Sequence, residues 1–372
     1  MRMIISGGGT GGHIYPAITI AREIAKLAEH CEILFVGTKQ GLEADIIPKE
    51  GFDFTTIEVR GLERKLSWKN VQTLFNTAGG VWKSIRIVKA FKPDVVIGTG
   101  GYVCGPVLLS ASLLKIPSMI QEQNVIPGIT NKILARFVDK IAIGYQEARG
   151  YFTEYKPEQI IFTGNPIRPE VMSATREEGQ AALGLSSARL TLLVVGGSRG
   201  ARSINNAMLG VHKHFSGNKR IQILHVTGQN EYNSIVGNNK QAGIDISSDG
   251  NIIIKPYLYN MPLALAAADL AIFRAGAVGL AELTARGIPA ILVPYPYAAE
   301  NHQEFNAQAL AKQGAACVIA DKELSSAILI DTIERLLDNP EALADMAKKS
   351  KELGRPQAAE TIARLALSLK KP

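Results

Sequence analysis

The chain carries MIISGGGTGGHIYP at residues 3–16, a short apolar strand that runs into five glycines, a threonine, a histidine and a proline. Glycines at a turn from strand to helix let a ligand approach bare backbone, and the proline predicts a helix that begins at Pro16. The N-terminus of such a helix offers unpaired N–H groups and a partial positive charge. The stretch therefore predicts a phosphate seat in an α/β fold, and His13 adds a group that can accept a proton beside the anion.

The same loop also fits the dinucleotide-binding pattern. Its glycines satisfy G-x-G-x-x-G, a fingerprint that expects a carboxylate at the end of the next strand. The next predicted strand, at residues 33–36, is followed by Gly-Thr-Lys, without an acidic residue. Lys39 would suit a 2′-phosphate, so NADP binding stays open, with NAD less favoured. His13 likewise stays open as a helix-capping or buried side chain.

Length, charge and cysteine content limit the class of protein. A chain of 372 residues is longer than a single domain with one hydrophobic core usually is, which predicts two domains. The net charge of +7 fits an anionic partner, such as a membrane surface, a nucleic acid or a phosphorylated substrate. Three cysteines without metal-type spacing indicate buried thiols in a reducing cytosol. No signal peptide is expected, and no apolar run reaches the roughly 18 residues of a membrane span, so membrane contact should be peripheral.

Strand and helix patterns alternate along the chain, and the opening pattern of strand, glycine loop and helix occurs again half-way along it. Residues 190–195 form a buried-strand pattern that is followed by GGSRGA at 196–201 and a helix. Two openings of this kind predict two Rossmann-like α/β domains with parallel sheets. A proline-rich turn at 164–169 marks the boundary, and Arg-Pro at 355–356 precedes an amphipathic last helix at 358–369. The expected domains are 1–165 plus 356–372, and 166–355.

Unusual residues follow several predicted strands. Ligands of open parallel sheets bind beyond the carboxyl ends of the strands, so these residues are the site candidates. In the first half they are a second glycine loop at 98–102 and the polar triplet at 122–124. In the second half they are a turn at 274–277, which opens a helix carrying Glu282, and the polar segment at 301–303.

The loop at 196–200 reads G-x-S-x-G, which is also the nucleophile elbow of α/β-hydrolases. That fold needs an acid and then a histidine after the serine on one sheet, and this chain offers no clear pair. A phosphate loop accounts better for the sequence, with backbone N–H groups and the Ser198 hydroxyl binding a diphosphate.

Two glutamates are candidates for function. Glu282 lies among apolar residues near the start of its helix, where a carboxylate needs a partner. A ribose diol would supply two hydroxyl donors, and the alternative is a solvated helical glutamate. Glu122 ends a strand, where it is either a general base or site-orienting group, or a structural anchor of its loop.

A cationic and apolar stretch lies between Arg60 and Lys92. It holds eight lysines and arginines against one acid, together with both tryptophans of the chain. Such a mixture is typical of an interfacial membrane patch. Helices that pack their tryptophans inside the domain are the alternative, and nucleic acid is a weaker one because no binding module is recognisable. The candidate patch residues are Trp68, Lys69, Leu74, Phe75, Trp82, Lys83 and Arg86.

Taken together and in this order, the motifs resemble the MurG family of bacterial N-acetylglucosaminyltransferases, which convert lipid I to lipid II in peptidoglycan synthesis. The resemblance covers essentially the whole chain. The motifs that carry it lie at residues 8–13, 98–102, 122–124, 164–168, 196–201, 276–282 and 301–303.

The resemblance implies a GT-B fold, with two Rossmann-like domains whose parallel sheets face a central cleft. It implies an inverting transfer that needs no metal or other cofactor. The donor would be UDP-N-acetylglucosamine, held mainly by the second domain. The acceptor would be lipid I, an undecaprenyl-diphosphate-linked MurNAc-pentapeptide, reached by the first domain at the cytoplasmic face of the membrane.

The resemblance also implies roles for individual residues. Ser198 would contact the donor diphosphate, Leu258 the uracil and Gln303 the sugar. Within this reaction we expect His13 or Glu122 to take the proton of the attacking hydroxyl. The expected acceptor-diphosphate residues are Gly100, Gly101 and Tyr102, and the remaining donor contacts are Thr10, Gly11, Gly12, Asn124, Arg168, Ala277, Val278, Gly279, Leu280, Ala281 and Glu282.

Two other functions stay open. A soluble nucleotide-sugar epimerase would share the donor site but would have no use for the basic stretch. A non-catalytic nucleotide-binding protein would leave His13 and Glu122 replaceable. Carboxylates able to hold a divalent ion beside two phosphates are few, so no metal is expected, and neither is a nucleic-acid partner.

Overall fold

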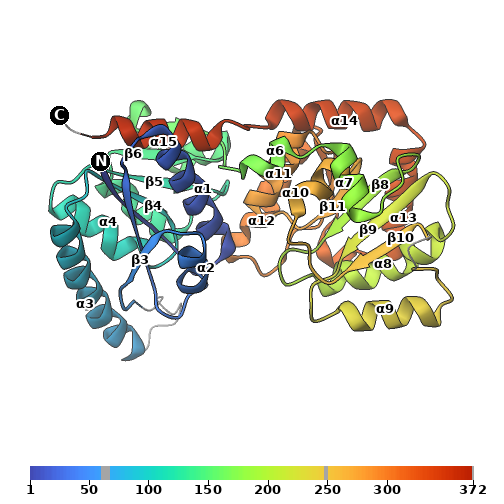
Figure 1. Ribbon diagram of the computed structural model, residues 1–372, viewed down its shortest axis with the longest axis horizontal. Helices are drawn as coiled ribbons and strands as arrows, with labels where there is room; N and C mark the ends of the chain where they lie inside the picture. Colours follow the sequence, from blue (N-terminus) through green and yellow to red (C-terminus); the bar gives the residue numbers. More distant parts are fainter. Residues whose placement is uncertain (60–67, 247–249, 371–372) are drawn as a thin grey trace. The chain divides into compact units, whose positions relative to one another are not determined.

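A computed structural model describes residues 1–59, 68–246 and 250–370 of the chain, with the backbone alone for residues 68–78 (Figure 1). The chain divides into two compact units. Unit 1 is Met1–Ile167 with Pro356–Pro372, and unit 2 is Arg168–Arg355. The sequence placed the boundary between residues 165 and 166, and the return to the first unit at 356.

Unit 1 is built on a seven-stranded sheet with the strand order β3-β2-β1-β4-β5-β6-β7. Every neighbouring pair in it is parallel, as the alternation of strands and helices predicted. The strands are β1 (Arg2–Gly7), β2 (Glu32–Gly37), β3 (Asp53–Thr56), β4 (Val95–Gly100), β5 (Ser118–Glu122), β6 (Lys140–Ile143) and β7 (Ile160–Phe162). The helices are α1 (Gly11–Leu27), α2 (Glu43–Lys49), α3 (Trp68–Phe91), α4 (Cys104–Leu113), α5 (Ile129–Leu134), η1 (Ala135–Phe137), η2 (Gln146–Tyr151), η3 (Pro157–Gln159) and α15 (Ala358–Ser368).

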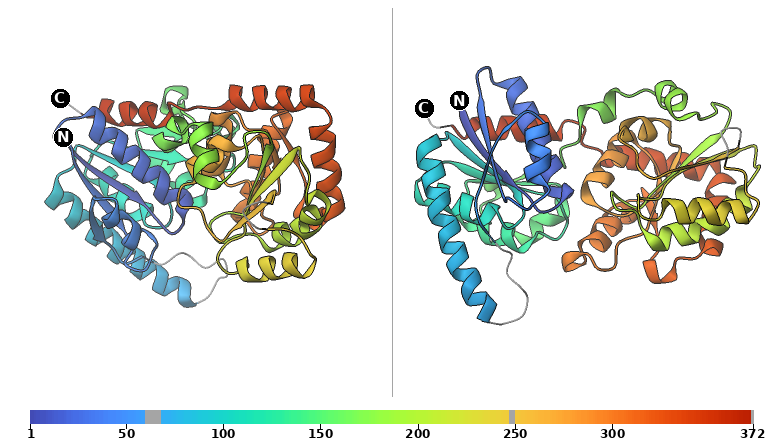
Figure 2. Two further views of the ribbon diagram at one scale, coloured as in Figure 1. Left: turned by 45° about the vertical axis from the view of Figure 1, so that its right-hand side comes forward. Right: turned by 60° about the horizontal axis from the view of Figure 1, so that its bottom comes forward.

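The helices of unit 1 cover both faces of its sheet. Met3 and Ile5 of β1 are buried in a core that includes α1 and α15, whereas Ile4 is buried on the other side with α4 and α5. This alternation is the period-2 pattern of a strand buried on both faces. The last helix, drawn red, lies beside α1, drawn blue, in Figures 1 and 2. The sequence prediction that residues 358–369 form an amphipathic helix packing on the first domain is confirmed.

The start of α1 corrects one expectation. The helix begins at Gly11 rather than at Pro16, and Pro16 lies inside it. The first turn closes when the N–H groups of His13 and Ile14 donate to the Thr10 carbonyl, at 3.1 and 3.2 Å. Because proline has no N–H, Pro16 leaves the Gly12 carbonyl without its usual helical donor.

Unit 2 is built on a six-stranded parallel sheet with the order β10-β9-β8-β11-β12-β13. Its strands are β8 (Leu190–Val195), β9 (Ile221–Val226), β10 (Ile252–Lys255), β11 (Leu270–Phe273), β12 (Ala290–Leu292) and β13 (Ala316–Val318). Its helices are α6 (Pro169–Ser173), α7 (Arg176–Leu183), α8 (Arg202–Phe215), α9 (Tyr232–Gln241), α10 (Met261–Ala267), α11 (Ala277–Arg286), η4 (Ala299–Asn301), α12 (His302–Lys312), η5 (Asp321–Glu323), α13 (Ser326–Leu337) and α14 (Pro340–Leu353).

A large core of unit 2 joins α8 and α13 to one face of the sheet. Both units thus repeat the predicted order of strand, glycine loop and helix, at β1–α1 and at β8–α8. The sheet order places β1 and β8 centrally, so each glycine loop follows an inner strand. Loops in that position are where open α/β sheets bind their ligands.

Candidate active site

His13 of unit 1 lies in the first turn of α1, just after the glycine loop. Its Nδ1 atom lies 3.0 Å from the Gly8 carbonyl oxygen and 3.5 Å from the Thr10 hydroxyl. A carbonyl oxygen can only accept, so Nδ1 carries the hydrogen and Nε2 keeps its lone pair. An imidazole in this tautomer is equipped to take a proton through Nε2.

The second glycine loop packs directly against the first. Gly100, with φ of +111°, lies so close to His13 that a Cβ atom there would be 2.7 Å from the ring Cδ2 atom. A Cβ at Gly101 would be 2.4 Å from the Gly8 carbonyl oxygen. The Gly8 N–H in turn donates to the Gly100 carbonyl at 3.2 Å. The structure therefore brings the predicted acceptor loop and His13 together, with Tyr102 beside them and exposed.

Glu43 is a residue of this site that the sequence interpretation missed. It opens α2, is buried, and accepts hydrogen bonds from the Gly9 N–H at 3.0 Å and from the N–H and hydroxyl of Thr38 at 2.9 and 2.7 Å. Burial raises the pKa of this carboxyl, but the hydrogen bonds outweigh it and hold the pKa below its ordinary value. The dinucleotide-binding pattern expects its acidic residue at the end of the second strand. Glu43 instead reaches back from the following helix and holds the glycine loop through the Gly9 N–H.

Glu122 ends β5 and is buried. Its Oε1 accepts from the backbone and side-chain N–H groups of Asn124, at 2.9 and 3.2 Å. Its Oε2 accepts from the Gly128 N–H at 3.1 Å and the Asn131 side chain at 2.7 Å. Four donors to one carboxylate are typical of a group that holds a loop in place. Of the two roles that the sequence left open for Glu122, this geometry favours the loop anchor.

The glycine loop of unit 2 follows β8. Ser198 is exposed in it, and Gly197 and Gly200 have φ of +92° and +77°, which few other residues adopt. The chain then enters α8, so the loop lies at the N-terminus of a helix of fourteen residues. A glycine loop that leads into a helix N-terminus is where anions often bind, and diphosphate binding at Ser198 stays a prediction.

A second helix N-terminus in unit 2 begins after the Gly276 turn. Along α11, Ala277, Leu280 and Glu282 are buried, whereas Val278, Gly279 and Ala281 are partly exposed. Glu282 Oε1 accepts from Nε and Nη2 of Arg168, at 3.2 and 3.0 Å. Burial raises the pKa of Glu282, and the nearby Arg168 charge opposes that shift. Glu282 is thus a paired, buried carboxylate and not the solvated residue of the alternative interpretation.

Arg274 is a second residue that the sequence interpretation left without a role. Its Nη1 donates to the carbonyls of Val293 and Pro294, each at 3.0 Å, and to Asp321 at 2.6 Å, while Nη2 donates to the Ser203 hydroxyl at 2.9 Å. The guanidinium therefore ties the ends of β11 and β12 to the first turn of α8. The sequence signal that could have indicated this role is a single arginine directly after an apolar strand.

Two further donor candidates of unit 2 are Leu258 and Gln303. Leu258 is partly buried in the loop after β10. Gln303 lies in the first turn of α12, where its Oε1 accepts from the Tyr295 N–H at 3.0 Å. Just before it, Glu300 and Asn301 both have positive φ, 53° and 52°. Strained residues of this kind cluster at ligand sites, and the strain is consistent with one here.

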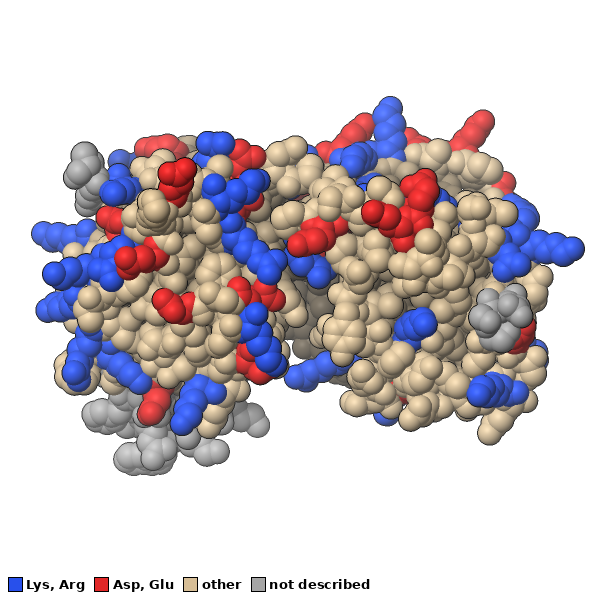
Figure 3. Space-filling view, in the orientation of Figure 1, with Lys and Arg blue, Asp and Glu red and all other residues tan. Residues whose placement is uncertain are grey.

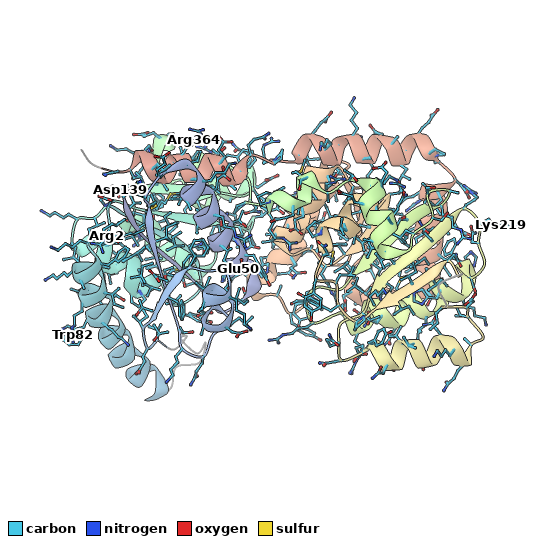
Figure 4. The ribbon with its side chains drawn as sticks, viewed as in Figure 1. Arg2, Glu50, Trp82, Asp139, Lys219 and Arg364 are labelled. Atoms are coloured by element: carbon cyan, nitrogen blue, oxygen red, sulfur yellow. The ribbon has the colours of Figure 1, made fainter. Side chains whose placement is uncertain are left out.

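The basic stretch is described in part. Residues 60–67 and the side chains of Trp68, Lys69, Leu74 and Phe75 lie outside the described part of the structure. Trp82 is 62% exposed, and the Arg86 guanidinium stacks on its ring at 4.8 Å. Trp82 points away from unit 1 in Figure 4, and Lys and Arg gather along the same edge in Figure 3. The alternative in which Trp82 packs inside the domain is therefore wrong for this residue.

In the described part of the chain, no group of at least three His, Cys, Asp or Glu side chains is placed to hold a metal ion. Over the same residues, none of the helices combines the length and the apolar character that a bilayer crossing requires.

Family models match both units. The glycosyltransferase family 28 N-terminal domain matches residues 3–143, and the family 28 C-terminal domain matches residues 191–362. A protein of Desulforamulus reducens is 51% identical over 97% of both chains, and one of Halothermothrix orenii is 48% identical over 98% of both. Both are UDP-N-acetylglucosamine–N-acetylmuramyl-(pentapeptide) pyrophosphoryl-undecaprenol N-acetylglucosamine transferases. The chain belongs to the MurG family of family 28 glycosyltransferases.

Solved structures agree with this MurG membership. Acinetobacter baumannii MurG is 27% identical, with a TM-score of 0.78 over 99% of both chains. A UDP-N-acetylglucosamine 2-epimerase of Neisseria meningitidis is 13% identical, with a TM-score of 0.72 over 99% of this chain and 100% of that one. The second likeness shows a shared fold alone. The predicted GT-B fold is confirmed, and the dinucleotide and hydrolase alternatives are wrong for a MurG chain.

Proposed function

We propose that this chain transfers N-acetylglucosamine from UDP-N-acetylglucosamine to the MurNAc residue of lipid I, which gives lipid II for peptidoglycan synthesis. The observation that carries the proposal is the near 50% identity to named transferases of this reaction over almost the whole chain. A match of that extent spans both units, so both are assigned to the one reaction.

Unit 2 holds the donor in this proposal. The Ser198 loop and the N-terminus of α11 (Ala277 to Glu282) bind the UDP diphosphate and ribose, with Arg168 beside Glu282. Leu258 lies against the uracil, and Gln303 binds the sugar through its amide N–H groups, since its Oε1 already accepts from the Tyr295 N–H. As the bond to the sugar breaks, negative charge develops on the departing diphosphate, and helix N-termini with N–H donors stabilise it.

Unit 1 supplies the acceptor side. His13 Nε2 takes the proton from the attacking hydroxyl, whose oxygen forms the new bond to the anomeric carbon while UDP leaves from the opposite face. Gly100, Gly101 and Tyr102 bind the acceptor diphosphate, and Thr10, Gly11, Gly12 and Asn124 contribute to the donor sugar and diphosphate. We assign the base to His13 because Nδ1–H donates to the Gly8 carbonyl, so that the acceptor lone pair of the neutral ring is on Nε2. Glu122 holds the loop that carries Asn124.

The reaction in this proposal needs no metal or other cofactor. In its place, the charge of the leaving diphosphate is balanced by the N-termini of α8 and α11 and by Arg168. No nucleic acid is a partner.

The chain acts at the cytoplasmic face of the cell membrane as a peripheral protein. Its acceptor is anchored by a polyprenyl tail, so unit 1 must reach the bilayer surface. Exposed Trp82 with Lys83 and Arg86 supports a contact of mixed apolar and cationic character. The undescribed side chains of Trp68, Lys69, Leu74 and Phe75 complete the proposed patch.

One assay tests the proposal against both alternatives. The protein is incubated with labelled UDP-N-acetylglucosamine and a prenyl-diphosphate-MurNAc-pentapeptide acceptor, and the lipid fraction is examined for a disaccharide. A transferase gives the disaccharide lipid. An epimerase would give free UDP-N-acetylmannosamine without acceptor, and a binding protein would give neither; either of those results would overturn the proposal.

A further inference from the structure

Two buried histidines of unit 2, His212 and His225, take no part in the proposed chemistry. His225 on β9 and His212 on α8 are fully buried, and their ring centroids lie 5.2 Å apart. Each hydrogen-bonds an asparagine: His225 Nε2 lies 3.1 Å from Asn205 Oδ1, and His212 Nδ1 lies 3.0 Å from Asn239 Oδ1. Strand β9 and helices α8 and α9 carry the cluster, and Figure 1 shows where these elements lie in unit 2.

The asparagines fix the tautomers of both rings. Asn205 Nδ2 donates to the Thr227 carbonyl at 2.9 Å, and Asn239 Nδ2 donates to the Ile235 carbonyl at 2.7 Å. Each amide therefore turns its oxygen to the imidazole and can only accept from it. His225 is the Nε2–H tautomer and His212 the Nδ1–H tautomer. The other nitrogen of each ring is buried and has no hydrogen-bond partner among the residues that the structure describes, which suits a lone pair and excludes a second N–H.

Only the His225 branch of the cluster leads to the glycine loop. The Thr227 carbonyl that Asn205 holds lies against Gly200, where a Cβ atom would be 2.0 Å from the carbonyl oxygen. The next residue, Gly228, packs closely against the glycine loop, because a Cβ atom added there would be 2.5 Å from the Arg199 carbonyl oxygen. The turns at 199–200 and 227–228 are therefore nested backbone against backbone. A shift of Thr227 must move Gly200, which is two residues from Ser198.

We propose that His225 is a positioning residue for the donor diphosphate loop, acting through Asn205 and Thr227. Its N–H fixes the orientation of the Asn205 amide, the amide holds the Thr227 carbonyl, and that carbonyl supports the loop at Gly200. Without the His225 donor, the Asn205 oxygen is buried and unsatisfied, and the amide gains by rotating away from Thr227. The inference rests on the proposed role of this loop in binding the UDP diphosphate.

The chain supplies a matched control. His225→Leu and His212→Leu each remove one neutral, buried imidazole and one hydrogen bond to a buried asparagine. Only the first removes a contact that leads to the loop, because Asn239 bonds within α9. Both variants should lose stability. His225→Leu should weaken UDP binding, measured by titration calorimetry, by about tenfold, the scale of one lost buried hydrogen bond. His212→Leu should bind UDP as the parent does.

Two amide variants separate the effect of the His225 hydrogen bond from the effect of the volume of its side chain. His225→Gln places an amide N–H where Nε2 was, within reach of Asn205, and should restore the affinity for UDP. His225→Asn carries the same amide one carbon short and should not. These two also serve if His225→Leu fails to fold. In turnover assays KM for the donor should rise in His225→Asn by the same factor as the Kd for UDP, with kcat changed little.

The outcomes distinguish this inference from the proposed function. Equal UDP affinity in His225→Leu, His225→Asn and the parent would overturn it, and so would an equal loss in His212→Leu. Glu282→Ala serves as the reference variant for the donor site itself. If Glu282→Ala weakens UDP binding and the His225 variants do not, only the positioning role fails. If Glu282→Ala has no effect either, the donor assignment of unit 2 is wrong.

Discussion

Arg168 and Glu282 form a bidentate-donor ion pair in unit 2, in which Nε and Nη2 of the arginine both donate to Oε1 of the glutamate. Glu282 is buried, and the Arg168 side chain is one-third exposed. Both residues are assigned to the donor site. The second carboxylate oxygen, Oε2, is the atom through which Glu282 can accept from a ribose hydroxyl without releasing Arg168.

Glu282→Ala should weaken binding of UDP and of UDP-N-acetylglucosamine by about ten- to a hundredfold, because hydrogen bonds to a charged group contribute roughly 1.5–3 kcal/mol. Titration calorimetry on the full chain measures this. Glu177→Ala, which removes an exposed helical glutamate of the same unit, is the control and should change nothing. In thermal unfolding without ligand, Arg168→Ala should lower Tm more than Glu282→Ala, since it leaves a buried carboxylate unpaired. Unchanged UDP affinity in Glu282→Ala would mean that Glu282 pairs with Arg168 and does not bind the ribose.

The sequence predicted much of this site, and the reasons for its failures are physical. Periodicity and glycine positions predicted both sheets and both loops, because these are local signals. The ion pair joins residues 114 apart in sequence, and no local pattern encodes such a partner. Glu43 escaped notice because its carboxylate reaches the loop from a helix, not from the strand end. Pro16 misled because proline is common, but not required, at the first helical position: α1 begins at Gly11, and Pro16 lies inside it.

His13→Ala should lower turnover by about a hundred- to ten-thousandfold, the usual effect of removing a general base, while UDP affinity stays unchanged. Glu122→Gln should act differently. It replaces one acceptor oxygen by an NH₂ group that faces N–H donors, so the loop at 123–131 should loosen and Tm should fall. Thermal unfolding separates the two roles: Tm should fall clearly in Glu122→Gln, which disturbs a buried hydrogen-bonded carboxylate, and much less in His13→Ala. A His13→Ala variant with near-normal turnover would exclude His13 as the base.

Turnover should survive saturating EDTA. The described residues offer no metal-ligand group, and the diphosphate charge is assigned to helix N-termini and Arg168. The measurement is the rate of disaccharide-lipid formation after dialysis against EDTA, with and without added Mg²⁺ or Mn²⁺. Loss of activity that either ion restores would mean that these dipoles and N–H groups are insufficient.

Binding to anionic vesicles should depend on the exposed basic face of α3. Each basic residue near an anionic surface contributes about 1 kcal/mol, and salt screens it. A triple variant with Lys83, Arg86 and Lys89 changed to glutamate should lose vesicle sedimentation at low salt while binding UDP normally. Trp82→Ala should instead reduce the part of the binding that high salt does not remove. The control reverses three exposed lysines of unit 2, at Lys219, Lys240 and Lys312. If the control variant is lost from vesicles and the α3 variant is not, the membrane contact lies on unit 2.

Unit 2 should lose stability on acidification through its histidine pair. Burial lowers the pKa of His212 to about 4, and burial, with a smaller electrostatic contribution from the nearby His212 ring, lowers the pKa of His225 well below its ordinary value. The unfolded chain binds these protons near pH 6.5, so it holds more protons than the folded chain below that pH. Stability is therefore complete above about pH 6.5 and falls as the pH drops, by roughly 1.4 kcal/mol per pH unit for each imidazole. Both tryptophans lie in unit 1, so tryptophan fluorescence does not report on the unfolding of unit 2. The suitable measurement is hydrogen exchange of β9 and α8 at pH 7 and 5, corrected for intrinsic exchange rates. A variant with both histidines changed to glutamine should lose this slope, and a slope that persists in it would assign the acid sensitivity to other groups.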